Sequence, residues 1–140
     1  MRASATTPWI VLGCIAAFAA LRAYGQGLTS FAYPSRIRRI AEAIAFAEGF
    51  QVSGSLAQQN HNPGNLTRLD GSFQVYASNE YGWSALYDYV DRMLSGLGLY
   101  PSGISIQEAA RIYTATEQSA WANNVASYLG VNVYTPLEAV

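Results

Sequence analysis

The chain has 140 residues, of which 51% are hydrophobic and 12% are charged, and it carries eight basic and nine acidic residues. This length fits one small domain, and the apolar content is high for a freely soluble one, which indicates a membrane contact. The near-neutral balance and the lack of lysine argue against a surface that follows phosphate groups, so we expect no nucleic-acid partner.

Residues 1–25 contain the most hydrophobic stretch. The run from Trp9 to Leu21 has no charged residue, and Arg22 follows it directly. A membrane-spanning helix needs about 20 apolar residues, whereas a signal-peptide core needs about 7 to 15. The segment therefore predicts an N-terminal transmembrane or signal-anchor helix that contacts the lipid membrane through residues 9–24, with a cleaved signal segment as the alternative.

Residues 26–35 carry glycine, serine, threonine and proline, which is typical of a linker. We expect the folded domain over residues 36–140. It opens with apolar residues at a 3.6-residue period from Arg36 to Ala47, which predicts a helix that Gly49 ends.

Glu48 falls in the last turn of this predicted helix, where a carboxylate is unfavourable by about 0.3–1 kcal/mol because the carbonyl end is partly negative. Phe46 and Phe50 are close in the sequence and predict partial desolvation. Both effects raise the pKa of a carboxyl group toward the range of a general acid, so Glu48 is a candidate proton donor. The alternative is an exposed glutamate without a chemical role.

The middle of the chain predicts a turn and one small β-hairpin. Pro63 and Gly64 suit the two central positions of a type II turn. Asp70 and Gly71 separate "NLTRL" from "SFQVY", where apolar and polar residues alternate as in a hairpin.

The rest of the chain predicts three more helices. An apolar stripe runs through residues 83–97, and Ser105 with Glu108 forms a capping box that opens a helix through Tyr113. A last helix, with Trp121 on its apolar face, ends at Gly130. The expected fold is therefore mainly α, with α+β character from the single hairpin.

The remaining acids have structural explanations. Asp70 belongs to the predicted hairpin turn, Glu80 to the favourable first turn of a helix, and Glu108 to the capping box, so the pattern identifies no second catalytic carboxylate. His61 stands without cysteine or carboxylate neighbours and makes a poor metal site. We expect neither a metal nor a cofactor.

The order of several motifs resembles one family. A helix ending in "AEGF" is followed by "NHNPGNL", the predicted hairpin, "YASNEYGWSAL" and "SIQEAARIYTATEQSAWANNVASYLGV". Over residues 35–140 this order is similar to that of small phage-encoded members of the lysozyme-like superfamily, which includes lytic transglycosylases and goose-type lysozymes. The resemblance implies a lysozyme-like domain in which the acid that ends the first domain helix protonates the glycosidic oxygen of peptidoglycan. Matched by motif, that acid is Glu48.

The resemblance also implies substrate-binding residues. In similar proteins the Asn-Pro-Gly-Asn loop borders the saccharide cleft, so Asn62 and Asn65 are expected to bind a sugar, to position the acid, or only to shape the turn. Tyr113 is a further candidate cleft residue, although "IYTATEQ" replaces the Tyr-Asn-Ala-Gly segment of many lytic transglycosylases. Two-carboxylate hydrolysis needs a second acid, so a single glutamate fits a lytic transglycosylase better.

We therefore expect a peptidoglycan-degrading lytic transglycosylase or lysozyme-like muramidase that is phage-derived and membrane-anchored and acts in cell-wall entry or lysis. Its partners would be peptidoglycan strands, the lipid membrane and other virion proteins, and its domain would face the peptidoglycan. The basic residues after the anchor favour a cytoplasmic domain by the positive-inside rule, which conflicts with that localisation. The alternative is a catalytically inactive lysozyme-like virion membrane protein with a structural or glycan-binding role.

Overall fold

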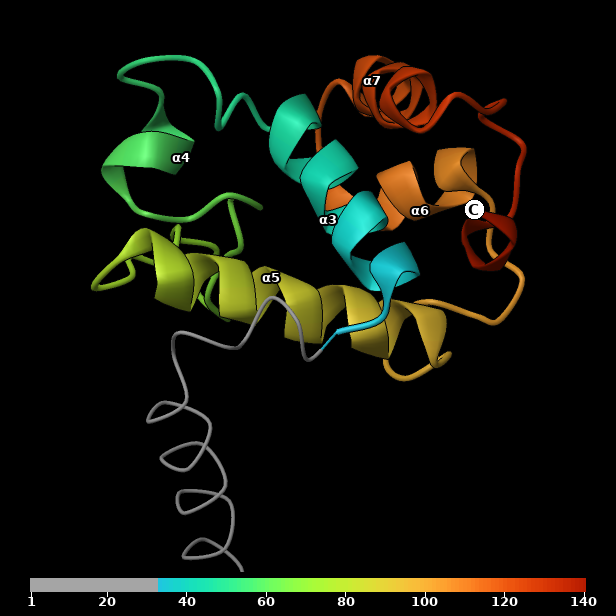
Figure 1. The fold of residues 1–140 in the computed structure, drawn as a ribbon, viewed down its shortest axis with the longest axis horizontal. Helices are drawn as coiled ribbons and strands as arrows, with labels where there is room; N and C mark the ends of the chain where they lie inside the picture. The colour runs from blue at the N-terminus through green and yellow to red at the C-terminus, as the bar shows by residue number, and fades with distance from the viewer. Residues whose placement is uncertain (1–32) are drawn as a thin grey trace, which may run out of the picture. The chain divides into compact units, whose positions relative to one another are not determined.

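The computed structural model describes residues 33–140, and Tyr33–Val140 form one compact unit. In chain order the elements are α3 (Ser35–Ala47), α4 (Leu56–Gln59), α5 (Asn79–Leu94), α6 (Ile106–Tyr113), α7 (Gln118–Leu129) and a 3-10 helix, η1 (Leu137–Ala139) (Figure 1). The mainly helical part of the expected fold is therefore observed.

Helix α3 is central because it packs against both α5 and α7. Its buried residues include Ile40 and Ile44, which are fully enclosed, and burial of such a side chain stabilises the fold by about 1.5–3 kcal/mol. Helix α6 packs against α7 and starts with the predicted capping box of Ser105 and Glu108. Helix α3, which Glu48 directly follows, is thus packed against neighbouring helices on two sides.

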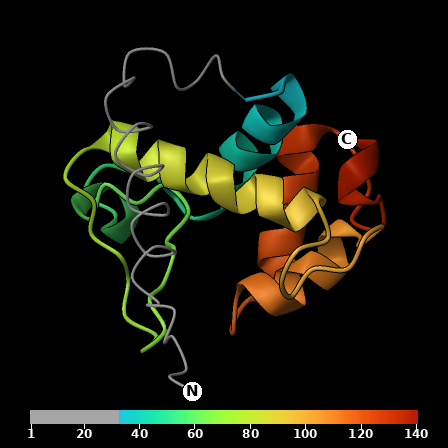
Figure 2. The ribbon, with the colours of Figure 1, turned by 90° about the horizontal axis from the view of Figure 1, so that it is seen from below.

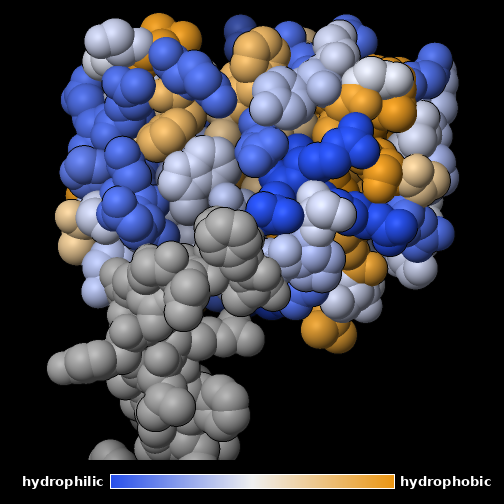
Figure 3. Space-filling model, viewed as in Figure 1, coloured by the Kyte–Doolittle hydropathy of each residue, from blue (hydrophilic) through white to orange (hydrophobic). Residues whose placement is uncertain are grey.

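Helices α3 and α5 run between two sides of the unit. In Figures 1 and 2, α4 and the irregular segment after it (residues 60–78) lie on one side, and α6, α7 and the C-terminus lie on the other. Figure 3 shows hydrophilic residues over much of one face, with apolar residues in several separate areas. The end of α3, the irregular segment and the turn between α6 and α7 all line one hollow.

The predicted β-hairpin is wrong, and with it the α+β fold class, because residues 33–140 contain no β-strand. Residues 66–74 do reverse direction at the predicted position, where Gly71 has a φ of 83°. The two arms of this reversal form a single antiparallel bridge, between Thr67 and Phe73, in place of the strand pairing of a hairpin.

Side chains take the hydrogen bonds that a strand ladder would need. Leu66 and Gln74 face each other, and the Gln74 N–H donates to the Leu66 carbonyl over 2.8 Å. The return bond is missing, since the Leu66 N–H donates to Asn62 Oδ1 over 2.9 Å. Asn62 Nδ2 donates in turn to the carbonyls of Leu66 and Gln74, each over 2.9 Å. The amide of Asn62 thus replaces strand pairing with side-chain bonds.

The expected N-terminal transmembrane or signal-anchor helix is not seen either. Among the helices of residues 33–140, none combines the length and the hydrophobicity that crossing a membrane would need. Residues 1–25, to which the prediction applies, lie outside the described part of the chain.

Two glycines let the irregular segment pack closely. The Pro63-Gly64 turn forms, but Gly64 does not have a positive φ, so the predicted type II turn is wrong. A Cβ on Gly64 would lie 2.7 Å from Leu86 Cδ1, and a Cβ on Gly82 would lie 1.8 Å from the His61 carbonyl oxygen. Glycine is required at both positions by close approach.

We expect Gly82→Ala to lower the free energy of unfolding by about 2–3 kcal/mol, because overpacking costs about 1–3 kcal/mol and the obstacle here is backbone. Urea unfolding measures the change. Ser84→Ala in the same helix is the matched control and should stay within about 0.5 kcal/mol of wild type. Equal stability of the two variants would contradict the close approach of α5 to the segment at His61.

Asn62→Asp should be destabilising by about 3 kcal/mol or more near neutral pH. The substitution removes both hydrogen bonds that Asn62 Nδ2 donates and puts a charge in a site with no solvent access. Asn123→Asp, at an exposed position of α7, controls for the change in net charge. Denaturant midpoints that agree for the two variants would mean that the Asn62 amide does not hold its loop.

Candidate active site

Glu48 directly follows the last residue of α3, and its N–H donates to the Ile44 carbonyl over 2.9 Å. Gly49 comes next with a φ of 72°, so the helix ends there as predicted. The carboxylate accepts two hydrogen bonds: Trp121 Nε1 donates to Oε1 over 2.9 Å, and Asn65 Nδ2 donates to Oε2 over 2.8 Å. Three segments far apart in the sequence meet at this one group.

Burial raises the pKa of Glu48 above its ordinary value, and this effect outweighs the hydrogen bonds from Asn65 and Trp121, which lower it. The enclosing groups differ from those the sequence indicated. Phe46 is exposed and packs on Tyr128, with ring centroids 5.4 Å apart, so it does not form the expected apolar wall. The raised pKa suits a group that must hold a proton near neutral pH.

The Asn65 amide can serve both protonation states of Glu48. Its Nδ2 donates to the carboxylate, while its Oδ1 is buried and has no hydrogen-bond partner within residues 33–140. A half-turn of an amide exchanges its donor and its acceptor, so protonated Glu48 could donate to Oδ1 instead. The backbone of Asn65 has a φ of 45°, a conformation that asparagine tolerates better than most residues.

Tyr113, the last residue of α6, contacts the loop that carries Asn65. Its hydroxyl donates to the Gly64 carbonyl over 2.6 Å, and its ring stacks on Trp121 with centroids 4.8 Å apart. Burial of the hydroxyl, helped by the negative charge of Glu48, holds the pKa of Tyr113 well above its ordinary value. Tyr113 therefore remains a neutral donor that positions the turn and does not exchange protons near neutral pH.

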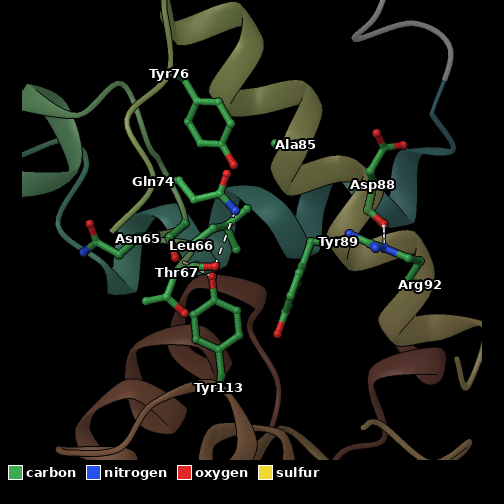
Figure 4. A pocket seen from close by; sticks show the side chains of 11 residues that line it. Asn65, Leu66, Thr67, Gln74, Tyr76, Ala85, Asp88, Tyr89, Arg92 and Tyr113 are labelled. Carbon is green, nitrogen blue, oxygen red and sulfur yellow. Dashed lines mark hydrogen bonds between the residues drawn. The ribbon is translucent and has the colours of Figure 1, made fainter. Parts of the chain in front are cut away.

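Two hollows adjoin at this point, with volumes of about 440 and 410 Å³. Asn65, Thr67 and Tyr113 line both of them, and Glu48 lines the smaller one. Figure 4 shows the larger hollow, where Tyr113 reaches toward the turn and Tyr89 extends from α5. Each volume falls within the range of small-ligand pockets, and an extended ligand that fills both must pass Asn65.

The predicted site residues separate into two groups. Asn65 and Tyr113 lie at the wall of the hollow that holds Glu48. Asn62 is fully buried, and its side-chain amide makes hydrogen bonds to the backbone of its own loop, so it offers no surface to a ligand. Asn62 acts through Asn65, whose N–H donates to the Asn62 carbonyl over 3.0 Å.

The sequence did not identify two residues of this site. Trp121 was predicted on the buried face of a helix, and it is buried, but its indole N–H also holds Glu48. Glu117 lines the same hollow and directly precedes α7 with a φ of 53°, in the left-handed region that costs an L-residue roughly 1–2 kcal/mol. No propensity in "TATEQ" signals that conformation.

The three acids that the sequence explained structurally each have a serine partner, and that of Glu108 is the predicted one. Ser72 lowers the pKa of Asp70 through hydrogen bonds at the turn, and Ser78 lowers that of Glu80. Glu108 accepts from Ser105 in the capping box, which lowers its pKa as well. These carboxylates favour the ionised state, unlike Glu48.

The raised pKa of Glu48 predicts a pH dependence of stability. A carboxyl group that binds its proton more tightly in the folded state favours folding below its unfolded pKa and loses that contribution as the pH rises through its folded pKa. We expect the stability of wild type relative to Glu48→Gln to fall as the pH rises above 4.5, the ordinary value. Urea unfolding of both proteins across pH 4–8 measures it, and parallel curves would contradict the shift.

Comparisons with known proteins add no assignment to this geometry: no protein-family model matches the chain, and no curated protein and no solved structure matches it.

Proposed function

We propose that this chain cleaves the glycan strands of peptidoglycan, with Glu48 as the proton donor. The observation that carries the proposal is one carboxyl group at the wall of a hollow, where burial raises its pKa while Asn65 and Trp121 fix both of its oxygens. The resemblance of the motifs around Glu48 to those of small phage lysozyme-like proteins supplies the substrate class.

The reaction begins with Glu48 protonated. Glu48 transfers its proton to the oxygen of a β-1,4 glycosidic bond as the bond from that oxygen to the anomeric carbon breaks, and positive charge develops on the sugar ring. The carboxylate that remains accepts hydrogen bonds from Asn65 and Trp121. Burial thus favours the acid before the transfer, and the two donors stabilise the anion after it.

The two adjoining hollows support an extended polymeric ligand. A strand that fills both would bring one of its glycosidic bonds past Asn65 and Glu48. The walls offer the groups that saccharides use: polar side chains such as Gln74 for hydroxyl groups, and the exposed ring of Phe73 for the apolar face of a sugar.

We expect Glu48→Gln to slow the release of soluble fragments from purified peptidoglycan by about 10²–10⁴-fold, the usual contribution of a general acid. Glu42→Gln, one carboxylate earlier in the same helix and exposed, is the matched control and should cleave as wild type does. Turbidity loss and mass analysis of the fragments measure the rates.

Two results would contradict the proposal. The first is cleavage by Glu48→Gln at the wild-type rate. The second is a wild-type protein that pellets with the wall material and releases nothing from it, which would favour the glycan-binding alternative.

A further inference from the structure

Glu117 has an unusual backbone for its residue type. It precedes the first residue of α7 with φ 53° and ψ 30°, and its side chain makes no capping hydrogen bond to the helix. The other two non-glycine residues with positive φ in residues 33–140 use their side chains: His61 pairs with Asn79, and Asn65 holds Glu48. Glycine would fit this position without strain, so the local fold does not explain a glutamate here.

Glu117 and Glu48 share one hollow. Of the carboxylates within residues 33–140, these two line it. Trp121 makes a hydrogen bond to each of these residues. Its backbone N–H donates to the backbone carbonyl of Glu117 over 2.9 Å, and its indole N–H donates to Glu48 Oε1 over 2.9 Å. The backbone of Glu117 is thus fixed next to the residue whose indole holds the Glu48 carboxylate.

The two carboxyl groups have different environments. Glu48 is partly buried and held by two donors, whereas Glu117 is exposed and open to water. A buried carboxyl group and a solvent-exposed one at the same hollow are the arrangement that separate acid and base roles require. The hollow, at about 410 Å³, has room for a sugar ring and a water molecule together.

We propose that Glu117 is the general base of a hydrolytic reaction, so that this site cuts the strand with water; the inference rests on the proposed function of Glu48. The Glu117 carboxylate takes a proton from a water molecule, and the water oxygen bonds to the anomeric carbon. The glycosidic C–O bond breaks, and the leaving oxygen takes the proton of Glu48. The products are a new 4-hydroxyl end and a reducing end of inverted configuration, and the two acids regain their starting states by exchange with solvent.

Digestion of purified peptidoglycan in H2(18)O tests the inference. Wild type should release fragments that carry one heavy oxygen at each new reducing end, and Glu117→Gln should release them at least 100-fold more slowly. Glu42→Gln should match wild type. Wild-type fragments that are all lighter by one water, as an anhydro ring requires, would overturn the role of Glu117 and leave that of Glu48 intact. A wild type that releases nothing would overturn both.

A second variant separates chemistry from folding. Glu117→Gly relieves the left-handed strain, so its Tm should equal or exceed that of wild type while hydrolysis is lost. Azide needs no deprotonation, so added azide should restore strand cleavage by Glu117→Gly and leave a glycosyl azide end. A folded Glu117→Gly that hydrolyses at the wild-type rate, or that azide does not rescue, would contradict the proposed base.

Discussion

The fixed position of the Asn62 amide is the constraint on which the site depends. This side chain has no exposed surface, and it accepts a hydrogen bond from the Leu66 N–H and donates to the carbonyl groups of Leu66 and Gln74. The result is a rigid turn in place of a β-ladder. Because the turn is rigid, Asn65 reaches the carboxylate at the end of α3, and the Tyr113 hydroxyl finds the Gly64 carbonyl at 2.6 Å. The polar loop, more than any helix, sets the geometry around Glu48.

The behaviour of Glu48 follows from two opposed effects of that geometry. Removal from water disfavours the carboxylate, and hydrogen bonds from Asn65 and Trp121 favour it. Burial wins, so the group keeps its proton more tightly than a free glutamate. The donors nevertheless remain in place for the anion, and the buried Oδ1 of Asn65 offers an acceptor for the acid. The proton donor that we propose here must be reprotonated in each cycle, so it needs an environment that tolerates both states.

The sequence predicted what depends on local pattern and missed what depends on distant contacts. Helical periodicity, the Ser105 capping box and the stop at Gly49 were all readable, because neighbours along the chain determine them. The hairpin was predicted from alternation and Asp-Gly, but alternation cannot reveal that a side chain four residues upstream takes the ladder bonds of Leu66. Trp121 looked like a core residue and is one, and only the fold brings its indole N–H to an acid 73 residues earlier.

Two of the three non-glycine residues with positive φ in residues 33–140 lie at the site. The core around Ile40, Ile44 and other enclosed apolar side chains is built from residues that suit their conformations. Both Asn65 and Glu117, by contrast, line the hollow that holds Glu48 and adopt left-handed conformations that glycine would adopt at lower cost. What both side chains share is a place at the wall beside the Glu48 carboxyl group, and the chemistry that we propose there gives them a use that packing does not supply.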